Sequence, residues 1–229
     1  MRKILLSHIF LLMIALVPLH QSSLAKPSSN SPSVLKQLEK ESHGTLEVTW
    51  SKETNTPSML KGRLTAPSRH SPEWIAYEFV NKKRKLFGLQ NPRRDLKVVE
   101  VDRLHEKTVV RFQRLLFRTP VWEDCILVEI NNHDGVIERI EATVHPNLEK
   151  RLFNRPMHPA ISSKKAIDTA MSSIKGEFVK ESSVESYYLA TRPGTPLIYV
   201  VKLQHLSPAK MTTVMIHSVT GRIIEQKNP

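Results

Sequence analysis

Cysteine and glycine are scarce in this chain, and both shortages restrict what it can be. Cys125 is the only cysteine among 229 residues. No disulfide can therefore form within the chain, so packing alone must stabilise the fold. Cys125 lies in a strand-like run and is predicted to be a buried small hydrophobe, with an intermolecular disulfide as the alternative. Seven glycines are few for an enzyme that cradles phosphates in a glycine-rich loop.

Long apolar runs are confined to the N-terminus. Met1-Arg2-Lys3 is positively charged, residues 4–19 are largely apolar, and Ser23-Leu24-Ala25 places small residues where a signal peptidase cleaves. This pattern predicts a secretory signal peptide over residues 1–25, with an uncleaved membrane anchor as the alternative. We therefore expect a secreted, extracellular protein that has no membrane contact after the signal is removed.

Catalytic motifs are also missing. His105-Glu106 is followed by Lys107-Thr108-Val109, so the zinc protease signature His-Glu-x-x-His does not occur. Neither a Gly-x-Ser-x-Gly elbow nor a paired Cys-x-x-Cys is present. Glu138 and Glu141 lie three apart on a predicted strand and so face opposite sides of it. We predict that the protein is not an enzyme and holds no metal and no cofactor. Three histidines without metal-ligand spacing are predicted to lie on the surface: His133, His145 and His158.

Basic charge is what the sequence has in excess. The chain carries 34 Lys and Arg against 22 Asp and Glu, a formal net charge of +12. Loss of Arg2 and Lys3 with the signal peptide would leave +10. Such a charge attracts acidic partners over a distance, here an acidic enzyme surface or an anionic cell wall. Nucleic acid is not expected, because the chain is predicted to be exported and has no nucleic-acid-binding motif.

Residues 26–150 are predicted to form a lead-in and a first unit. Residues 26–43 are rich in Ser, Pro, Lys and Glu and are expected to be flexible, with a short helix at 34–41 as the alternative. In the unit over residues 44–150, Ser71-Pro72-Glu73 predicts a helix start and Gly88 its C-cap. Apolar–polar alternation predicts six strands: 46–50, 59–65, 96–102, 108–116, 125–131 and 136–144.

Residues 151–229 are predicted to form a second unit. Ser162 is a predicted N-cap, and Gly176 ends the helix whose apolar side chains share one face. Four strands are expected after this helix: 186–191, 197–206, 211–217 and 222–224. We therefore predict an α+β protein of two lobes, each a curved antiparallel sheet packed against helix.

Several short motifs carry a family resemblance through their order and spacing over residues 44–224. They are Trp50 to Ser58 (WSKETNTPS), Lys61 to Thr65 (KGRLT), Leu86 to Leu89 (LFGL), Val110 to Gln113 (VRFQ), Thr119 to Val121 (TPV), Pro146 to Leu148 (PNL) and Thr220 to Ile224 (TGRII). Together they resemble the prosegments of thermolysin-like (M4) metalloproteases. Residues 44–150 resemble the fungalysin/thermolysin propeptide domain, and residues 151–229 resemble the PepSY domain.

The resemblance implies a protein that binds a protease. Prosegments of this family template the folding of their catalytic domain and block its active-site cleft. Because the chain ends at Pro229, where the protease would begin, we expect a stand-alone propeptide that inhibits, or assists folding of, a thermolysin-like zinc metalloprotease in trans. Two alternatives stay open: a cell-wall-associated binding module, and the prosegment of a truncated protease gene.

Three departures from the family pattern mark where this chain differs. Trp122-Glu-Asp-Cys125 follows Val121 where the family often has Phe-Gly-Gly, so a glycine-dependent turn is expected to change. Ala142 stands in place of a glycine, and His217-Ser218 in place of Asp-Ala.

The candidate partner-binding residues lie beside the first of these departures and in the C-terminal tail. They are Trp122, Ile224, Glu225, Gln226, Asn228 and Pro229. Packing within the fold is the alternative role for Trp122 and Ile224.

Overall fold

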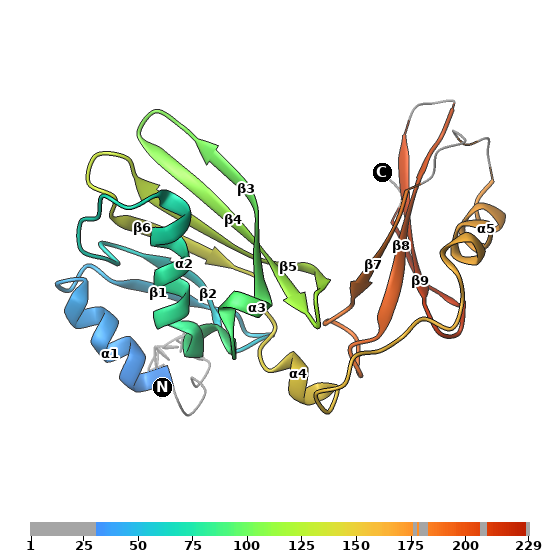
Figure 1. Cartoon of the computed structure of the whole chain (residues 1–229), viewed down its shortest axis with the longest axis horizontal. Coiled ribbons are helices and arrows are strands. Elements are labelled where there is room, and N and C mark those ends of the chain that lie inside the picture. Colours follow the sequence, from blue (N-terminus) through green and yellow to red (C-terminus); the bar gives the residue numbers. More distant parts are fainter. Residues whose placement is uncertain (1–30, 176–177, 179–182, 207–209, 228–229) are drawn as a thin grey trace, which may run out of the picture.

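The computed structural model describes residues 31–175, 178, 183–206 and 210–227, which form two lobes (Figure 1). The fold is α+β, as predicted. The elements are α1 (Ser31–Glu41), β1 (Glu47–Trp50), β2 (Pro57–Lys61), α2 (Pro72–Lys82), the 3-10 helix η1 (Arg84–Phe87), α3 (Pro92–Asp95), β3 (Leu96–Arg103), β4 (Lys107–Leu116), β5 (Thr119–Asn131), β6 (Ile137–Ala142), α4 (Leu148–Arg151), α5 (Ser163–Ser173), β7 (Ser183–Tyr188), β8 (Leu197–Gln204), β9 (Met211–His217) and β10 (Ile223–Lys227). No helix within these ranges is long and apolar enough to cross a bilayer. The predicted signal peptide lies outside them.

The first lobe is an antiparallel sheet with helices on one face. Its strands run in the order β1-β2-β6-β5-β4-β3, and α1 and α2 cover the same face (Figure 1). β4 alternates buried and half-exposed residues, as a strand does when one of its faces is covered. Its buried Val110 and Phe112 join the side chains of α2, including Phe79, in one apolar core. This core anchors the first lobe.

The predicted signals at both ends of the α2 region are confirmed. The Ser71 hydroxyl accepts a hydrogen bond from the backbone N–H of Trp74, and Pro72 opens the helix. After α2, η1 ends at Gly88, whose φ of 62° is left-handed. A Cβ on Gly88 would lie 2.2 Å from the Cβ of Pro146, so only glycine fits against the chain that leaves the first lobe.

The lead-in predicted to be flexible is instead packed wherever the structure describes it. α1 begins at Ser31, and its Leu38 is fully buried in the core of the first lobe. At the end of α1, Glu41 accepts a hydrogen bond from the nearly buried Lys83 ammonium at 2.7 Å. The prediction of flexibility is therefore wrong for residues 31–43, and the alternative, a short helix at 34–41, is confirmed by α1. An apolar stripe of a few residues is enough to bury one face of this helix.

The second lobe is a four-stranded antiparallel sheet covered on one face by α5. The strand order is β7-β8-β9-β10. The predicted N-cap Ser162 accepts a hydrogen bond from the N–H of Lys165, and α5 ends at Ser173. Ala166 and Ala170 pack against side chains of β8 and β9 such as Val201. The predicted end signal, Gly176, lies outside the described residues.

The two sheets are linked, which the sequence analysis did not foresee. Val121 of β5 pairs in parallel with Tyr188 of β7, so one hydrogen-bonded path runs through both lobes. A separate apolar cluster lies at this junction, where Val121 and Leu116 of the first lobe meet Leu148 of α4 and Tyr188. The lobes therefore share a core as well as a strand pairing.

A buried ion cluster reinforces the same junction. Arg114 of β4 is fully buried and pairs with Asp95 of α3 at 3.2 Å and with Glu149 of α4 at 2.9 Å. The backbone N–H of Asn91 donates a further hydrogen bond to Asp95. The sequence analysis did not identify this cluster. It stabilises the position of α4, from which the chain enters the second lobe.

Candidate functional site

A large bulge in β5 carries the first of the predicted partner-binding residues. Gln113 of β4 pairs with Cys125, and Leu115 pairs with Pro120, so residues 121–124 of β5 lie opposite the single residue between them. The Gln113 amide fills this bulge by donating to the carbonyl oxygens of residues 121 and 124, at 2.8 and 3.0 Å. The bulge turns β5 from the first sheet toward the second.

Glu123 occupies the centre of the bulge in a left-handed conformation, with φ of 59°. The family pattern has glycine at this position, where such a φ costs least. Here a glutamate adopts the left-handed conformation. The glycine of the family pattern is the sequence signal that could have located the bulge.

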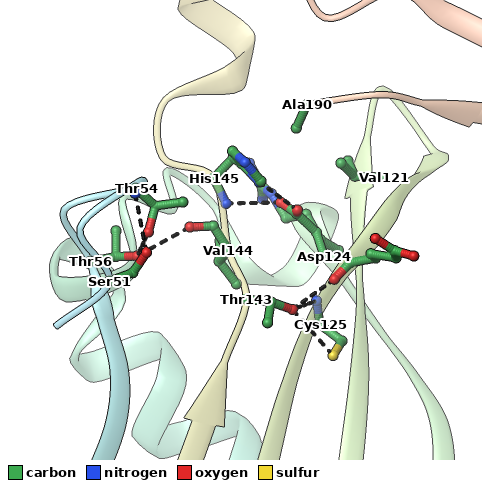
Figure 2. Close-up of polar contacts among 12 residues, drawn as sticks. Ser51, Thr54, Thr56, Val121, Asp124, Cys125, Thr143, Val144, His145 and Ala190 are labelled. Atoms are coloured by element: carbon green, nitrogen blue, oxygen red, sulfur yellow. Dashed lines mark hydrogen bonds and ion pairs between the residues drawn. The ribbon is translucent and has the colours of Figure 1, made fainter. Parts of the chain in front are cut away.

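A polar network fixes the bulge to the segment that leaves β6 (Figure 2). Asp124 is buried, and its carboxylate accepts the backbone N–H of His145 at 2.9 Å and contacts His145 Nδ1 at 2.7 Å. The Thr143 hydroxyl donates to the carbonyl of Glu123 at 2.7 Å and accepts the N–H of Cys125 at 3.2 Å. The bulge is therefore held from one side by Gln113 and from the other by this segment.

Trp122 projects from the bulge onto the second lobe. Its ring lies edge-on to Tyr187 of β7, with centroids 5.1 Å apart. Ile224 of β10 packs in the same cluster, and the Lys227 ammonium lies 5.9 Å from the Trp122 ring centroid. Trp122 Nε1 is buried with no hydrogen-bond partner in the structure. We call the surface formed by Trp122, Tyr187, Ile224 and Lys227 the seam face.

The seam face lies on the side of the second sheet opposite α5. Side chains alternate along β8: Tyr199 and Val201 pack with α5, whereas Ile198 and Val200 lie beneath Trp122, Tyr187 and Ile224. In Figure 1, α5 is on the side of this sheet turned away from the first lobe. The seam face is therefore directed toward the space between the lobes.

Charged groups surround the aromatic side chains of the seam face. Lys227 donates to Glu123 at 3.0 Å, and this hydrogen bond raises the pKa of Lys227 above its ordinary value. Burial, together with a 2.5 Å hydrogen bond donated to Glu185, raises the pKa of Tyr187 to about 12. The surface thus has an apolar centre and a rim of both charge signs.

The structure brings together three of the six predicted partner-binding residues. Trp122 and Ile224 both belong to the seam face and are half-buried, so each packs within the fold and also exposes one edge. Glu225 lies at the rim, 3.8 Å from Lys227. Gln226 pairs across from Val214, which packs on the α5 side of the sheet, so it belongs to the other face. The last two predicted residues, Asn228 and Pro229, lie outside the described part of the chain.

His145 and Cys125 differ from their predictions. The His145 side chain is 14% exposed and is bound to Asp124, so it is not a surface histidine. Cys125 is a free thiol that is half-buried rather than buried. Although Asp124 and His145 resemble part of a catalytic triad, the Cys125 sulfur contacts Thr143 at 3.5 Å and points away from the histidine ring (Figure 2). Over the described ranges, no three potential ligand side chains gather into a metal site.

Comparison with known proteins finds a similarity to a protease. It is 25% identical over 182 residues to bacillolysin from Bacillus cereus, a match that covers 76% of this chain and 31% of bacillolysin. The chain thus spans about a third of the length of this relative. The match supports a relation to the M4 metalloproteases, in line with the resemblance noted above. No family model matches the chain.

Solved structures give a looser likeness. The C-terminal domain of YpeB from Bacillus megaterium superposes with a TM-score of 0.37 at 13% identity, covering 86% of this chain and 96% of that one. YpmB from Bacillus subtilis gives a TM-score of 0.24 at 16% identity, covering 71% and 100%. Both scores are low.

Proposed function

We propose that the protein binds a thermolysin-like zinc metalloprotease in trans and inhibits it or assists its folding. The observation that carries this proposal is the 182-residue match to bacillolysin in a chain that has no His-Glu-x-x-His signature. We therefore propose that the chain acts through binding rather than through zinc chemistry of its own. We further assign the binding to the seam face.

The seam face has the composition of a protein-binding surface. Trp122 and Tyr187 are the residue types that most often dominate binding energy, and both stand on a buried apolar base. Glu185, Glu225 and Lys227 form the polar rim that surrounds the centre of typical interfaces. A partner docked here would bury apolar area at the centre and keep its charged groups hydrated at the edge.

β10 adds a second means of contact. Within the described sheet, β10 pairs with β9 alone and ends the strand order, so one backbone edge is open. An extended segment of the protease could pair with this edge, as peptides do when they add a strand to a sheet. The charged side chains of Glu225 and Lys227 disfavour non-specific pairing of this edge with other strands.

Binding to the native enzyme would also explain assisted folding. A ligand that binds the folded protease but not its unfolded chain stabilises the folded state by mass action, about 2.7 kcal/mol at a hundred times the dissociation constant. Inhibition and chaperoning are thus two results of the same contact.

The test is a titration of a purified thermolysin-like protease with the purified protein at low and at moderate salt. We expect stoichiometric inhibition, or rescue of the denatured enzyme, that persists at moderate salt because apolar contacts are not screened. The double variant W122A/Y187A should weaken the effect by at least about 30-fold, which corresponds to the roughly 2 kcal/mol that one such anchor contributes. If the wild-type protein neither inhibits the enzyme nor rescues it after denaturation, the proposal is overturned.

Trp74 supplies the matched control. It lies on α2 of the first lobe, away from the seam face, and is 46% exposed. The W74A variant removes the same kind of side chain and should leave the titration unchanged. Equal losses in both variants would show that the seam face is not the contact.

A second candidate function is a binding module held at an anionic cell wall. The formal charge of +12 favours it. Wall binding would disappear over a modest rise in salt, because it depends on screened surface charge. The same two-salt comparison, made with isolated cell walls, therefore separates the two functions.

A further inference from the structure

The turn that follows α4 presents an unusually exposed aromatic side chain. Phe153 is 85% exposed, whereas no other large apolar residue that the structure describes exceeds 56%. α4 and this turn lie at the outer edge of the molecule, between the two lobes (Figure 1). A single exposed apolar residue is ordinary on a protein surface, so its meaning depends on how the turn holds it and on what surrounds it.

The turn holds Phe153 in a backbone conformation that bulky residues rarely adopt. Its φ of 52° is left-handed, and the next residue, Asn154, has a φ of 58°. Backbone hydrogen bonds close the turn: the N–H of Phe153 donates to the carbonyl of Lys150 at 3.1 Å, and the N–H of Asn154 donates to the carbonyl of Glu149 at 2.8 Å. The backbone of the turn therefore fixes the position from which the ring projects into solvent.

Packing on both sides of Phe153 anchors the turn to the junction of the lobes. Leu152 and Met157 are half-buried and pack on the apolar cluster that contains Leu148 and Tyr188. The backbone N–H of Met157 also donates to the Tyr188 hydroxyl at 2.9 Å. Because the residues before and after it are held in place, Phe153 projects from a fixed base.

Basic side chains flank this ring along the chain. Lys150, Arg151 and Arg155 are exposed, and none of them forms an ion pair within the part of the chain that the structure describes. The one acidic residue between positions 146 and 164 is Glu149, which is buried and pairs with Arg114. The segment therefore adds positive charge and no exposed carboxylate. We call residues 150–155 the basic tip.

A loop of the second lobe adds to the charge of the basic tip. The Arg151 guanidinium donates to the carbonyl of Ala190 at 3.3 Å, which brings the loop over residues 189–196 beside the tip. This loop contains the exposed Arg192 and no acidic residue. Attraction to an anionic surface therefore acts over an area wider than the tip alone.

We propose that the basic tip docks the protein on an anionic lipid bilayer, with the Phe153 ring inserted below the headgroups and the basic side chains against the lipid phosphates. Binding of this kind grows with the apolar area buried and with attraction to anionic lipids. An anionic wall polymer would use the charges but would leave the ring in water, so a lipid surface fits the tip better. The proposal replaces the expectation of no membrane contact, and it does not depend on protease binding.

The test is cosedimentation of purified residues 26–229 with vesicles of phosphatidylcholine alone and with vesicles of phosphatidylcholine and phosphatidylglycerol in equal amounts. Residues 1–25 are omitted because the apolar residues 4–19 would bind lipid themselves, and both described lobes lie within the remaining chain. We expect binding to the anionic vesicles alone, with an affinity that falls as salt rises.

Variants of the basic tip separate the ring from the charges. F153N should weaken binding about 10-fold by removing the apolar ring, and it keeps the turn because asparagine tolerates a left-handed φ. F153W should retain binding, and its added fluorescence should shift to shorter wavelengths on anionic vesicles. K150A/R155A should weaken binding by at least about 10-fold.

Matched controls lie elsewhere in the chain. L206N removes an exposed apolar side chain beyond the end of β8 opposite the junction, and K36A/K40A removes two positive charges from exposed positions of α1. Both variants should bind anionic vesicles as the wild type does.

Three results would overturn the proposal. The first is the absence of binding to anionic vesicles. The second is unchanged binding by F153N, which would leave only general charge attraction of the kind that a wall polymer also exerts. The third is loss of protease inhibition in F153N without any vesicle binding, which would make the basic tip a protein contact.

Discussion

At the scale of single residues, Glu123 is one of several non-glycine residues that the structure holds in the left-handed region. A non-glycine residue in the left-handed region costs roughly 1–2 kcal/mol, and here it is a glutamate whose φ is 59°. The structure around it, from Gln113 to Thr143, imposes that conformation through hydrogen bonds. Glu123 in return forms the exposed ion pair with Lys227, which is worth little in water.

Two substitutions at Glu123 test this strain. Glu123→Gly relieves it, whereas Glu123→Val worsens it, because a β-branched side chain is an outlier at positive φ. Both variants lose the same ion pair. We expect the free energy of unfolding of the valine variant to be lower than that of the glycine variant by about 1–2 kcal/mol, measured by urea denaturation. Equal stabilities would contradict a fixed left-handed bulge.

The elevated pKa of Tyr187 predicts a loss of stability at high pH. The unfolded tyrosine ionises near pH 10, whereas the folded one does so near 12. Between these values the folded state binds more protons, so the stability contributed by Tyr187 is complete below pH 10 and falls as pH rises toward 12. Glu185→Gln should lower the pKa of Tyr187 and flatten this fall, as followed by tyrosinate absorbance and urea denaturation.

Glu106 is exposed and shares no hydrogen bond with a tyrosine among the described residues, so Glu106→Gln is the control for that titration. Tyrosinate absorbance that is unchanged in the Glu185→Gln variant would show that the Glu185 carboxylate does not hold the phenol proton.

Residue-scale features were the hardest to predict from sequence. Ser71, Ser162 and Gly88 were identified because capping depends on local backbone geometry. His145 and Arg114 were missed because their partners Asp124, Asp95 and Glu149 are distant in sequence. A buried charge in a strand looks like a surface residue until its partner is located in space.

At the scale of elements, α1 is the largest correction. The segment was expected to be flexible, with a short helix at 34–41 as the alternative; the structure has this helix, and Leu38 lies fully within the first core. Its apolar face is narrow. A weak 3.6-residue period of apolar residues in a polar segment does not reveal whether the helix packs against a sheet. The strands were easier to predict because alternation in β4 and β6 reports the covered face directly.

Leu38→Ala tests whether α1 is a structural element. Truncating a buried leucine costs about 2–5 kcal/mol, so the midpoint of urea denaturation should fall clearly. Lys36→Ala, at an exposed position of the same helix, should change it little. A Leu38→Ala variant as stable as the wild type would instead support the prediction that this segment is flexible.

At the scale of the whole molecule, the junction decides how the lobes behave. The Val121–Tyr188 pairing, the shared apolar cluster and the buried Arg114 cluster all join the lobes near α4. Two lobes were predicted from the repeated helix-and-strand pattern. Their connection was not, because a single parallel pairing across the seam leaves no periodic trace in the sequence.

Arg114→Leu should therefore destabilise both lobes together. It leaves Asp95 and Glu149 buried without their shared cation, at a cost of about 3–5 kcal/mol. Thermal unfolding followed by tryptophan fluorescence, with Trp74 in one lobe and Trp122 at the seam, should shift as one transition. Two separate transitions in the wild type would contradict a shared core.

The most direct test of the central claim is hydrogen–deuterium exchange of the protein alone and in a stoichiometric mixture with a thermolysin-like protease. The account predicts slower amide exchange in β7 and β10 and in the bulge at residues 121–124, with little change in α2. Protection confined to the helices of the first lobe, or no protection anywhere, would contradict binding through the seam face.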